Sequence, residues 1–252
     1  MDILSYIIIF TLIGSVVSLI GGVFLLAREK FALRISHFLS AFAAGTLLGV
    51  AFLDLIPESM EHMEELGLEI NLPFWTLFGI LLFFLLERFI HHHHQTSGQN
   101  EETVVPLIVI GDTVHNFVDG VAIAATFLIS VPLGIVTTFA VAAHEIPQEI
   151  ADFGLMLSKG VKRVKVLQIN FLSSLSGLLG AILTYIYQES LETILPLMLA
   201  LTAGFFIYIA SSNLIPEIHS RENKKVAFWE TVMLFVGVFV IYVAISSLEG
   251  SH

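Results

Sequence analysis

Eight apolar segments, each long enough to cross a lipid bilayer, constrain this chain more than any other feature of its sequence. A hydrocarbon core about 30 Å thick needs roughly 20 helical residues, with about 17 as the lower limit. Only 13% of the residues are charged and 56% are hydrophobic, whereas an average soluble domain carries about 25% charged residues. The sequence therefore predicts an all-α polytopic membrane protein whose eight transmembrane helices lie near Ile3–Ala27, His37–Glu58, Pro73–Phe89, Pro106–Ile129, Pro132–Leu157, Val166–Tyr187, Leu195–Ile218 and Val226–Ser246.

The first segment is expected to stay in the protein as a transmembrane helix. It begins MDILSYIIIF, with Asp2 where a signal peptide would carry basic residues, and its apolar run is too long for one. The chain has no cysteine, which excludes thiolate metal sites and thiol catalysis. Its formal net charge of −11 does not suggest nucleic-acid binding, so the lipid bilayer is the expected surrounding.

The basic residues predict the orientation of the chain. Every lysine and arginine follows the first, third, fifth or seventh segment, whereas the opposite loops carry glutamates, including Glu58–Glu69, Glu189 and Glu192. By the positive-inside rule, both termini are extracytoplasmic. The protein is expected in the plasma or inner membrane of the cell. Residues 88–105 then form a cytoplasmic loop, and its His91–His94 run predicts low-affinity metal binding.

An internal repeat relates the second and seventh segments. AGTLLGVAFLDLIPE (Ala44–Glu58) matches AGFFIYIASSNLIPE (Ala203–Glu217) at seven positions, including the whole of LIPE. In the eight-helix topology these two segments run in opposite directions, which is the signature of an inverted-repeat transporter. We therefore expect a single transporter domain over residues 1–252, with helices 1–3 and 6–8 related by inversion around a central pair, helices 4 and 5.

Two polar stripes interrupt that central pair. GDTVHNFVDG (Gly111–Gly120) and AHEIPQEIADF (Ala143–Phe153) lie in the middle of apolar runs, and only Ser130, Val131 and Pro132 separate the two helices. At about 100° per residue, the polar side chains of each stretch share one helical face. The tight hairpin makes the helices antiparallel neighbours, so the stripes are expected to meet.

Five acidic residues lie in these stripes, and no basic residue does. A carboxylate at the membrane centre costs about 3 kcal/mol on insertion scales, so together they exceed about 10 kcal/mol unless they are protonated, hydrated or neutralised by a cation. His115 and His144 favour a transition metal over Na⁺ or a proton alone, because neutral imidazole is a preferred ligand for such metals. The sequence therefore predicts a metal site between the two helices.

HNFVDG and HEIPQE resemble the paired signatures of the ZIP (Zrt/Irt-like) family of divalent metal transporters. The resemblance covers nearly the whole chain, and it implies import of zinc into the cytoplasm, or of iron, manganese, cobalt or cadmium, through a two-metal centre. It places one ion among His115, Asp119, His144 and Gln148, and a second among Asn116, Asp119, Glu145 and Glu149, with Asn170 as a further candidate ligand. Divalent ions are then the transported ligand and no cofactor is expected; a homodimer is a further candidate assembly.

The sequence departs from that family pattern at two positions. Many members have a histidine where this chain has Gln148, and Val50 is apolar where other members carry acidic or sulfur ligands. Two other functions share part of this pattern. HEIPQ begins like the HExxH of zinc metalloproteases, but Gln148 replaces the second histidine and Pro147 disrupts the helix. A membrane metal sensor would need the ligands but not the inverted repeat. A transporter, not an enzyme, is therefore expected.

Overall fold

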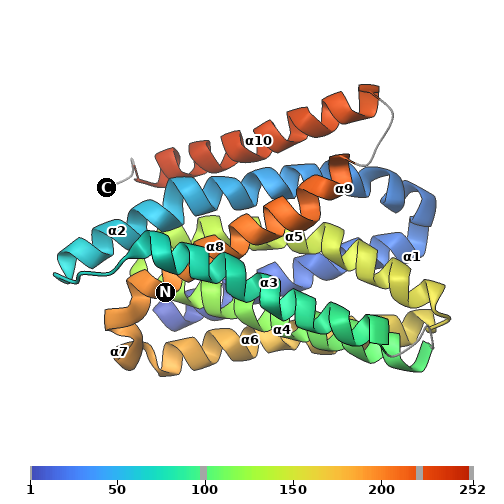
Figure 1. Ribbon diagram of the computed structural model, residues 1–252, viewed down its shortest axis with the longest axis horizontal. Coiled ribbons are helices and arrows are strands. Elements are labelled where there is room, and N and C mark those ends of the chain that lie inside the picture. The colour runs from blue at the N-terminus through green and yellow to red at the C-terminus, as the bar shows by residue number, and fades with distance from the viewer. Residues whose placement is uncertain (1, 97–100, 220–223, 250–252) are drawn as a thin grey trace.

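The computed structural model describes residues 2–96, 101–219 and 224–249, and within these ranges every regular element is helical (Figure 1). The all-helical prediction is thus confirmed. The long helices in chain order are α1 (Ile3–Val50), α3 (Leu72–Thr96), α4 (Glu101–Ile129), α5 (Val131–Ser158), α6 (Arg163–Ile186), α8 (Leu195–Tyr208) and α10 (Lys224–Glu249), with the short helices α2 (Ile56–Glu65), α7 (Gln188–Leu191) and α9 (Ile215–His219) between them.

The helix α1 contains the first predicted segment and most of the second, whose last residues form the π-helical turn Ala51–Leu55 and the start of α2. Together with α2 it runs from Ile3 to Glu65, 63 residues, and a straight helix of that length would be roughly 95 Å long, about three times the hydrocarbon thickness. Arg28 has non-helical angles, φ −145° and ψ 62°, and Figure 1 shows the chain turning back at this bend. The two arms therefore lie antiparallel, although the residues after Arg28 are helical where a loop up to Ser36 was predicted.

Five helical stretches meet the length and hydropathy that a membrane span requires, in the part of the chain that the structure describes: Ile3–Glu65, Ile108–Ile129, Arg163–Ile186, Gln188–Leu214 and Val226–Leu248. The chain is therefore an integral membrane protein. The helix α5 carries Glu145, Glu149 and Asp152 in its second half, which lowers its hydropathy. The total of eight spans, which needs the bend in α1 together with α3 and α5, stays a prediction.

The hairpin between α4 and α5 is as short as predicted. The helix α4 ends at Ile129, Ser130 is the N-cap of α5, and its hydroxyl accepts a hydrogen bond from the Leu133 backbone N–H at 3.3 Å. Pro132 lies in the first turn of α5, where no backbone N–H is needed. The helix α5 continues through Pro147, which has no N–H to donate to the Ala143 carbonyl.

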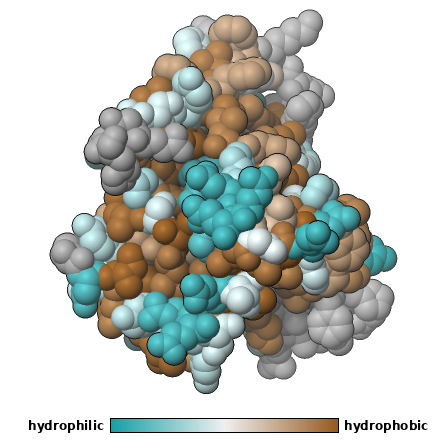
Figure 2. All heavy atoms as spheres, turned by 90° about the vertical axis from the view of Figure 1, so that its left-hand side faces the viewer, coloured by the Kyte–Doolittle hydropathy of each residue, from teal (hydrophilic) through white to brown (hydrophobic). Residues whose placement is uncertain are grey.

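Charged residues gather at two opposite ends of the helical bundle. The bend at Arg28 and the α5–α6 connection, with Lys159, Lys162 and Arg163, lie at one end, called here the basic end (right in Figure 1). The opposite end, called here the acidic end, has α2 and α7, which carry exposed glutamates. The start of α1 and the end of α10 also lie there. Figure 2 looks at the acidic end and shows separate hydrophilic patches within a hydrophobic surface.

Close helix contacts hold α4 in place at the end of the first stripe. A Cβ on Gly120 would collide with the carbonyl oxygen of Gly177 in α6, so only glycine allows the two backbones to approach this closely. Between this region and the acidic end lies the main hydrophobic core, which includes Ile123, Phe127 and Phe206, all about 1% exposed. The glycine that ends HNFVDG therefore sets the position of the polar face of α4.

Candidate metal centre

Four side chains from the two stripes converge between α4 and α5. His115 and Asp119 come from α4, His144 and Glu145 come from α5, and one ligand atom of each lies within 4.8 Å of the other three. All four residues are buried, with exposed fractions of 7%, 5%, 1% and 1%. The prediction that the stripes meet is confirmed, because residues 115 and 119 share one helical face and the hairpin brings residues 144 and 145 opposite that face.

The spacing of these donor atoms fits a tetrahedral metal ion. The two histidine Nε2 atoms are 3.1 Å apart, His115 Nε2 is 3.2 Å from Glu145 Oε1, and His144 Nε2 is 3.3 Å from Asp119 Oδ2. The pairs His115–Asp119 and His144–Glu145 are both 3.7 Å apart. Zinc–nitrogen and zinc–oxygen bonds of about 2.1 Å give tetrahedral edges of about 3.4 Å. The five distances scatter around that value, and the sixth pair, the carboxylates of Asp119 and Glu145, lies within 4.8 Å.

The other ring nitrogen of His144 fixes its orientation. Nδ1 lies 3.1 Å from the Ala140 carbonyl oxygen, one helical turn earlier in α5. A carbonyl only accepts, so Nδ1 is the protonated nitrogen and, in a neutral ring, the lone pair of Nε2 points into the cluster. Phe83 and Phe206 pack against the rings of His115 and His144, with centroids 5.7 and 6.2 Å apart.

The cluster carries more negative charge than the nearby protein neutralises. Asp119 Oδ2 and both carboxylate oxygens of Glu145 are buried and lack a hydrogen-bond donor among the described residues, unless a histidine Nε2 is protonated. Two carboxylates and two neutral imidazoles together have a charge of −2. A divalent cation would cancel that charge, and borderline metals such as zinc favour this mixed N/O set.

The other predicted ligands lie around this cluster in different ways. The amide nitrogen of Asn116 donates to the backbone oxygen and to Oδ1 of Asp112, at 3.0 and 2.9 Å, so it links the cluster face to that carboxylate. Glu149 is 1% exposed, and neither of its carboxylate oxygens has a hydrogen-bond partner in the described ranges. Asn170 in α6 donates to Val166 at 2.9 Å and keeps its side-chain oxygen unpaired within the same ranges.

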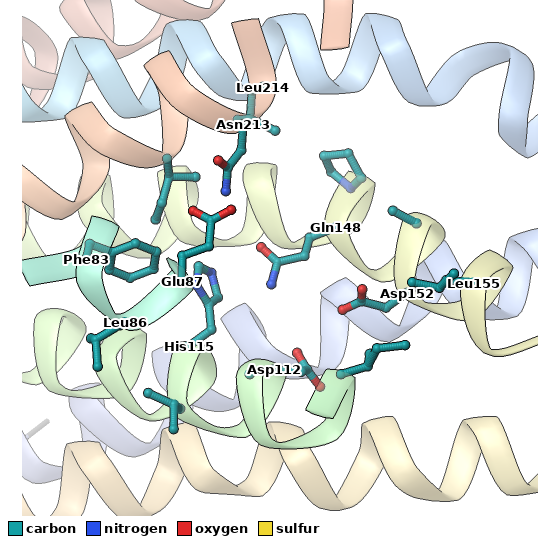
Figure 3. Close-up of a pocket in the computed structure, with 16 residues that line it drawn as sticks. Phe83, Leu86, Glu87, Asp112, His115, Gln148, Asp152, Leu155, Asn213 and Leu214 are labelled. Carbon is teal, nitrogen blue, oxygen red and sulfur yellow. The ribbon is translucent and has the colours of Figure 1, made fainter. Parts of the chain in front are cut away.

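A cavity of about 350 Å³ reaches His115 from the basic end (Figure 3). The lining residues indicate this direction. Asp112 precedes His115 in α4 and Asp152 follows His144 in α5, so both lie on the basic-end side of the cluster. The predicted ligand Gln148 lines this cavity, and its amide lies between His115 and Asp152 in Figure 3. The polar lining comprises Glu87, Asp112, His115, Gln148, Asp152 and Asn213.

Four of these cavity residues were not among the predicted ligands. Asp112 and Asp152 belong to the stripes, and their helical phase was already a signal that they face the same space. Glu87 and Asn213 come from α3 and from the π-helical turn Ile209–Leu214. No pattern in the sequence indicates that these two segments contribute to one cavity. The side chains of the predicted loop site His91–His94 lie outside the described residues.

Comparisons with known proteins identify a family and several relatives of this chain. A family model described as ZIP Zinc transporter matches residues 2–106 and 92–244. Zinc transporter ZIP13 of Pongo abelii is 31% identical over 259 residues, covering 92% of this chain and 76% of that protein. The ZIP13 of Mus musculus is 29% identical over 92% of this chain and 78% of its own length. An uncharacterized zinc transporter of Schizosaccharomyces pombe is 43% identical over 154 residues, covering 57% of this chain and 34% of its own length.

Proposed function

Because the chain belongs to the ZIP zinc transporter family, it is a metal ion transporter and not an enzyme, and we propose that it imports zinc through the cluster between α4 and α5. The observation that carries this proposal is the set of four buried donors, His115, Asp119, His144 and Glu145, at tetrahedral spacing. Iron, manganese, cobalt and cadmium are alternative cargoes, since mixed imidazole and carboxylate ligands accept several divalent metals.

A second ion would bind beside the first, toward the basic end. Glu149 supports this part of the proposal, because a buried carboxylate without a hydrogen-bond donor is costly unless a cation compensates it. Asp119 would bridge the two ions, with Asn116 and Asn170 offering amide oxygens to the second. In this assignment Glu145 joins the first ion, where the family resemblance places Gln148, and Gln148 lies where the ion leaves toward the cavity.

Alternating access by two inverted repeats is the proposed transport mechanism, and two pairs of features support it. A Cβ on Gly45 in α1 would collide with α10, and one on Gly204 in α8 would collide with α3. These glycines are equivalent in the sequence repeat, and their partners belong to the predicted eighth and third spans. The repeat-related helices also both contain a π-helical turn before LIPE, at Ala51–Leu55 and Ile209–Leu214. The first three and the last three of the eight predicted spans are therefore proposed as the two repeats, around α4 and α5.

The cavity on the basic end and the core on the acidic end suggest which side of the cluster is open. The basic-end cavity contains His115, whereas Phe127, Val136 and Ala140 lie in the packed core toward the acidic end. We assign the basic end to the cytoplasm by the positive-inside rule. The structure then corresponds to an inward-facing state in a plasma or inner membrane, with both termini extracytoplasmic. Lipid and a second copy of the chain are the proposed partners.

Zinc uptake by proteoliposomes containing only this protein tests the proposed function. We expect saturable ⁶⁵Zn²⁺ uptake that unlabelled zinc competes for, and that His144→Ala abolishes. Asp2→Asn is a suitable control, because Asp2 is exposed and only caps the first turn of α1 through the Ser5 backbone N–H. Zinc binding without flux would instead support a membrane metal sensor, and equal flux in His144→Ala would remove the cluster from the transport path.

A further inference from the structure

We infer that Asp112 and Asp152 form a separate binding site for a hydrated divalent cation, in the cavity between the cluster and the basic end. Both carboxylates point into the space between α4 and α5 in Figure 3. They line the same cavity, from two helices that pack against each other. The inference rests on the proposed function, because it describes where the ion goes after it leaves the cluster.

The state of Asp112 is the independent observation that points to a ligand. Asp112 is 6% exposed, and its Oδ1 accepts from the Asn116 amide at 2.9 Å. Its Oδ2 is buried and has no hydrogen-bond partner in the described part of the chain. The Ser173 hydroxyl also lies near this carboxylate. However, Ser173 Oγ also forms a hydrogen bond with Thr113 Oγ1, at 3.2 Å. A buried anionic oxygen of this kind is stabilised by a cation.

The surroundings distinguish this site from the cluster. Among the described residues that line the cavity, His115 is the only histidine. Because it already belongs to the cluster, the rest of this polar lining offers oxygen ligands. Its volume of about 350 Å³ is many times the roughly 30 Å³ that one water molecule occupies in the liquid. The bound ion would therefore keep most of its water and bind more weakly than in the cluster, as an ion about to be released should.

The positions along the helices place this site on the path of the ion. Asp112 is three residues before His115, a rise of about 4.5 Å, and Asp152 is seven residues after Glu145, about 10 Å. An ion that leaves the cluster through this cavity passes the carboxylates of Asp112 and Asp152 in its lining. Each neutralises part of its charge during rehydration.

Metal protection of an introduced thiol tests the inference, because the chain has no cysteine of its own. The thiol of Asp152→Cys is alkylated with a small maleimide in detergent, with and without zinc. At zinc about ten times its dissociation constant for this site, alkylation should slow roughly tenfold, because only the free fraction reacts. Asp112→Asn in the same chain should remove most of that protection, whereas His144→Ala should retain it.

Leu155→Cys is the matched control, since Leu155 lines the same cavity and is 40% exposed. Its alkylation should be nearly independent of zinc. Equal protection at both positions would indicate closure of the cavity instead of local binding, and protection that survives Asp112→Asn would also overturn the inference. If Asp152→Cys does not purify as a monodisperse protein, Asp112→Cys gives the reciprocal test. Adding Asp152→Asn to that variant should then remove the protection. This experiment measures binding and not flux, so a negative result here can be distinguished from a failure of the proposed transport function.

Discussion

Replacing Asp119 with asparagine should weaken zinc binding more than any equally conservative change outside the cluster. The Oδ2 of Asp119 lies 3.3 Å from His144 Nε2 and 3.7 Å from His115 Nε2, so it faces both imidazole donors. The substitution keeps the shape of the side chain and an amide oxygen, and removes one of the two charges that balance the ion. Removing one partner from a buried charged set costs about 3–5 kcal/mol.

That cost corresponds to a rise in the zinc dissociation constant of roughly a hundredfold to a few thousandfold, at about 1.4 kcal/mol per tenfold. Asp119→Asn should lie toward the lower limit, because the amide oxygen still contacts the ion, and Asp119→Ala toward the upper limit. Competition with a chromophoric zinc chelator in detergent measures both constants. Asp54→Asn is the matched control, because Asp54 is also buried, at 7% exposed, and lines a different cavity at the acidic end.

Thermal unfolding gives a second measurement of the same effect. At free zinc a hundred times the wild-type dissociation constant, binding adds about 2.7 kcal/mol to stability. If the constant rises a hundredfold in Asp119→Asn, the same zinc concentration adds only about 0.4 kcal/mol, so the zinc-dependent shift in Tm should nearly disappear. Affinity within about threefold of wild type, a difference below 0.7 kcal/mol, would refute Asp119 as a ligand.

Three further predictions concern selectivity, packing and orientation. Gln148→His adds a third imidazole beside the cluster and should raise the affinity for zinc relative to manganese in competitive uptake; an unchanged ratio would mean that Gln148 does not contact the ion. Gly120→Ala places a methyl group against the Gly177 carbonyl and should lower the Tm and the yield of monodisperse protein, unless α4 and α6 can separate. In intact cells, an impermeant maleimide should label Glu64→Cys but not Lys162→Cys; labelling of both would contradict the proposed topology.

The centre of the site could be predicted from sequence because it depends on local geometry. Helical periodicity places His115 and Asp119 on one face. Because the connection is as short as Ser130, α5 must pack antiparallel beside α4. These two facts determine which stripes meet. Whether the four converging residues bind metal in the cell stays a prediction, since geometry and family membership support it without measuring it.

Other features depend on tertiary packing and could not be read from the sequence. The continuation of helix beyond Arg28 and the π-helical turn Ala51–Leu55 change only backbone angles, and neither has a distinctive residue pattern. The grouping of Glu145, instead of Gln148, with the two histidines depends on how far α5 is rotated about its axis. Positions 145 and 148 are separated by only about 60° around the helix axis, and sequence periodicity does not resolve such a difference.

The position of Gln148 bears on how such a site can both bind and release an ion. Two carboxylates and two imidazoles already satisfy the charge and the coordination of a tetrahedral divalent ion, so a third imidazole would mainly slow its departure. A neutral amide at the boundary with the cavity offers a weaker oxygen ligand, which an ion can take up and leave quickly. Beyond it the cavity is lined by the carboxylates of Asp112 and Asp152, so an ion that moves toward the basic end exchanges nitrogen ligands for oxygen ligands. Fast release is therefore consistent with glutamine at position 148.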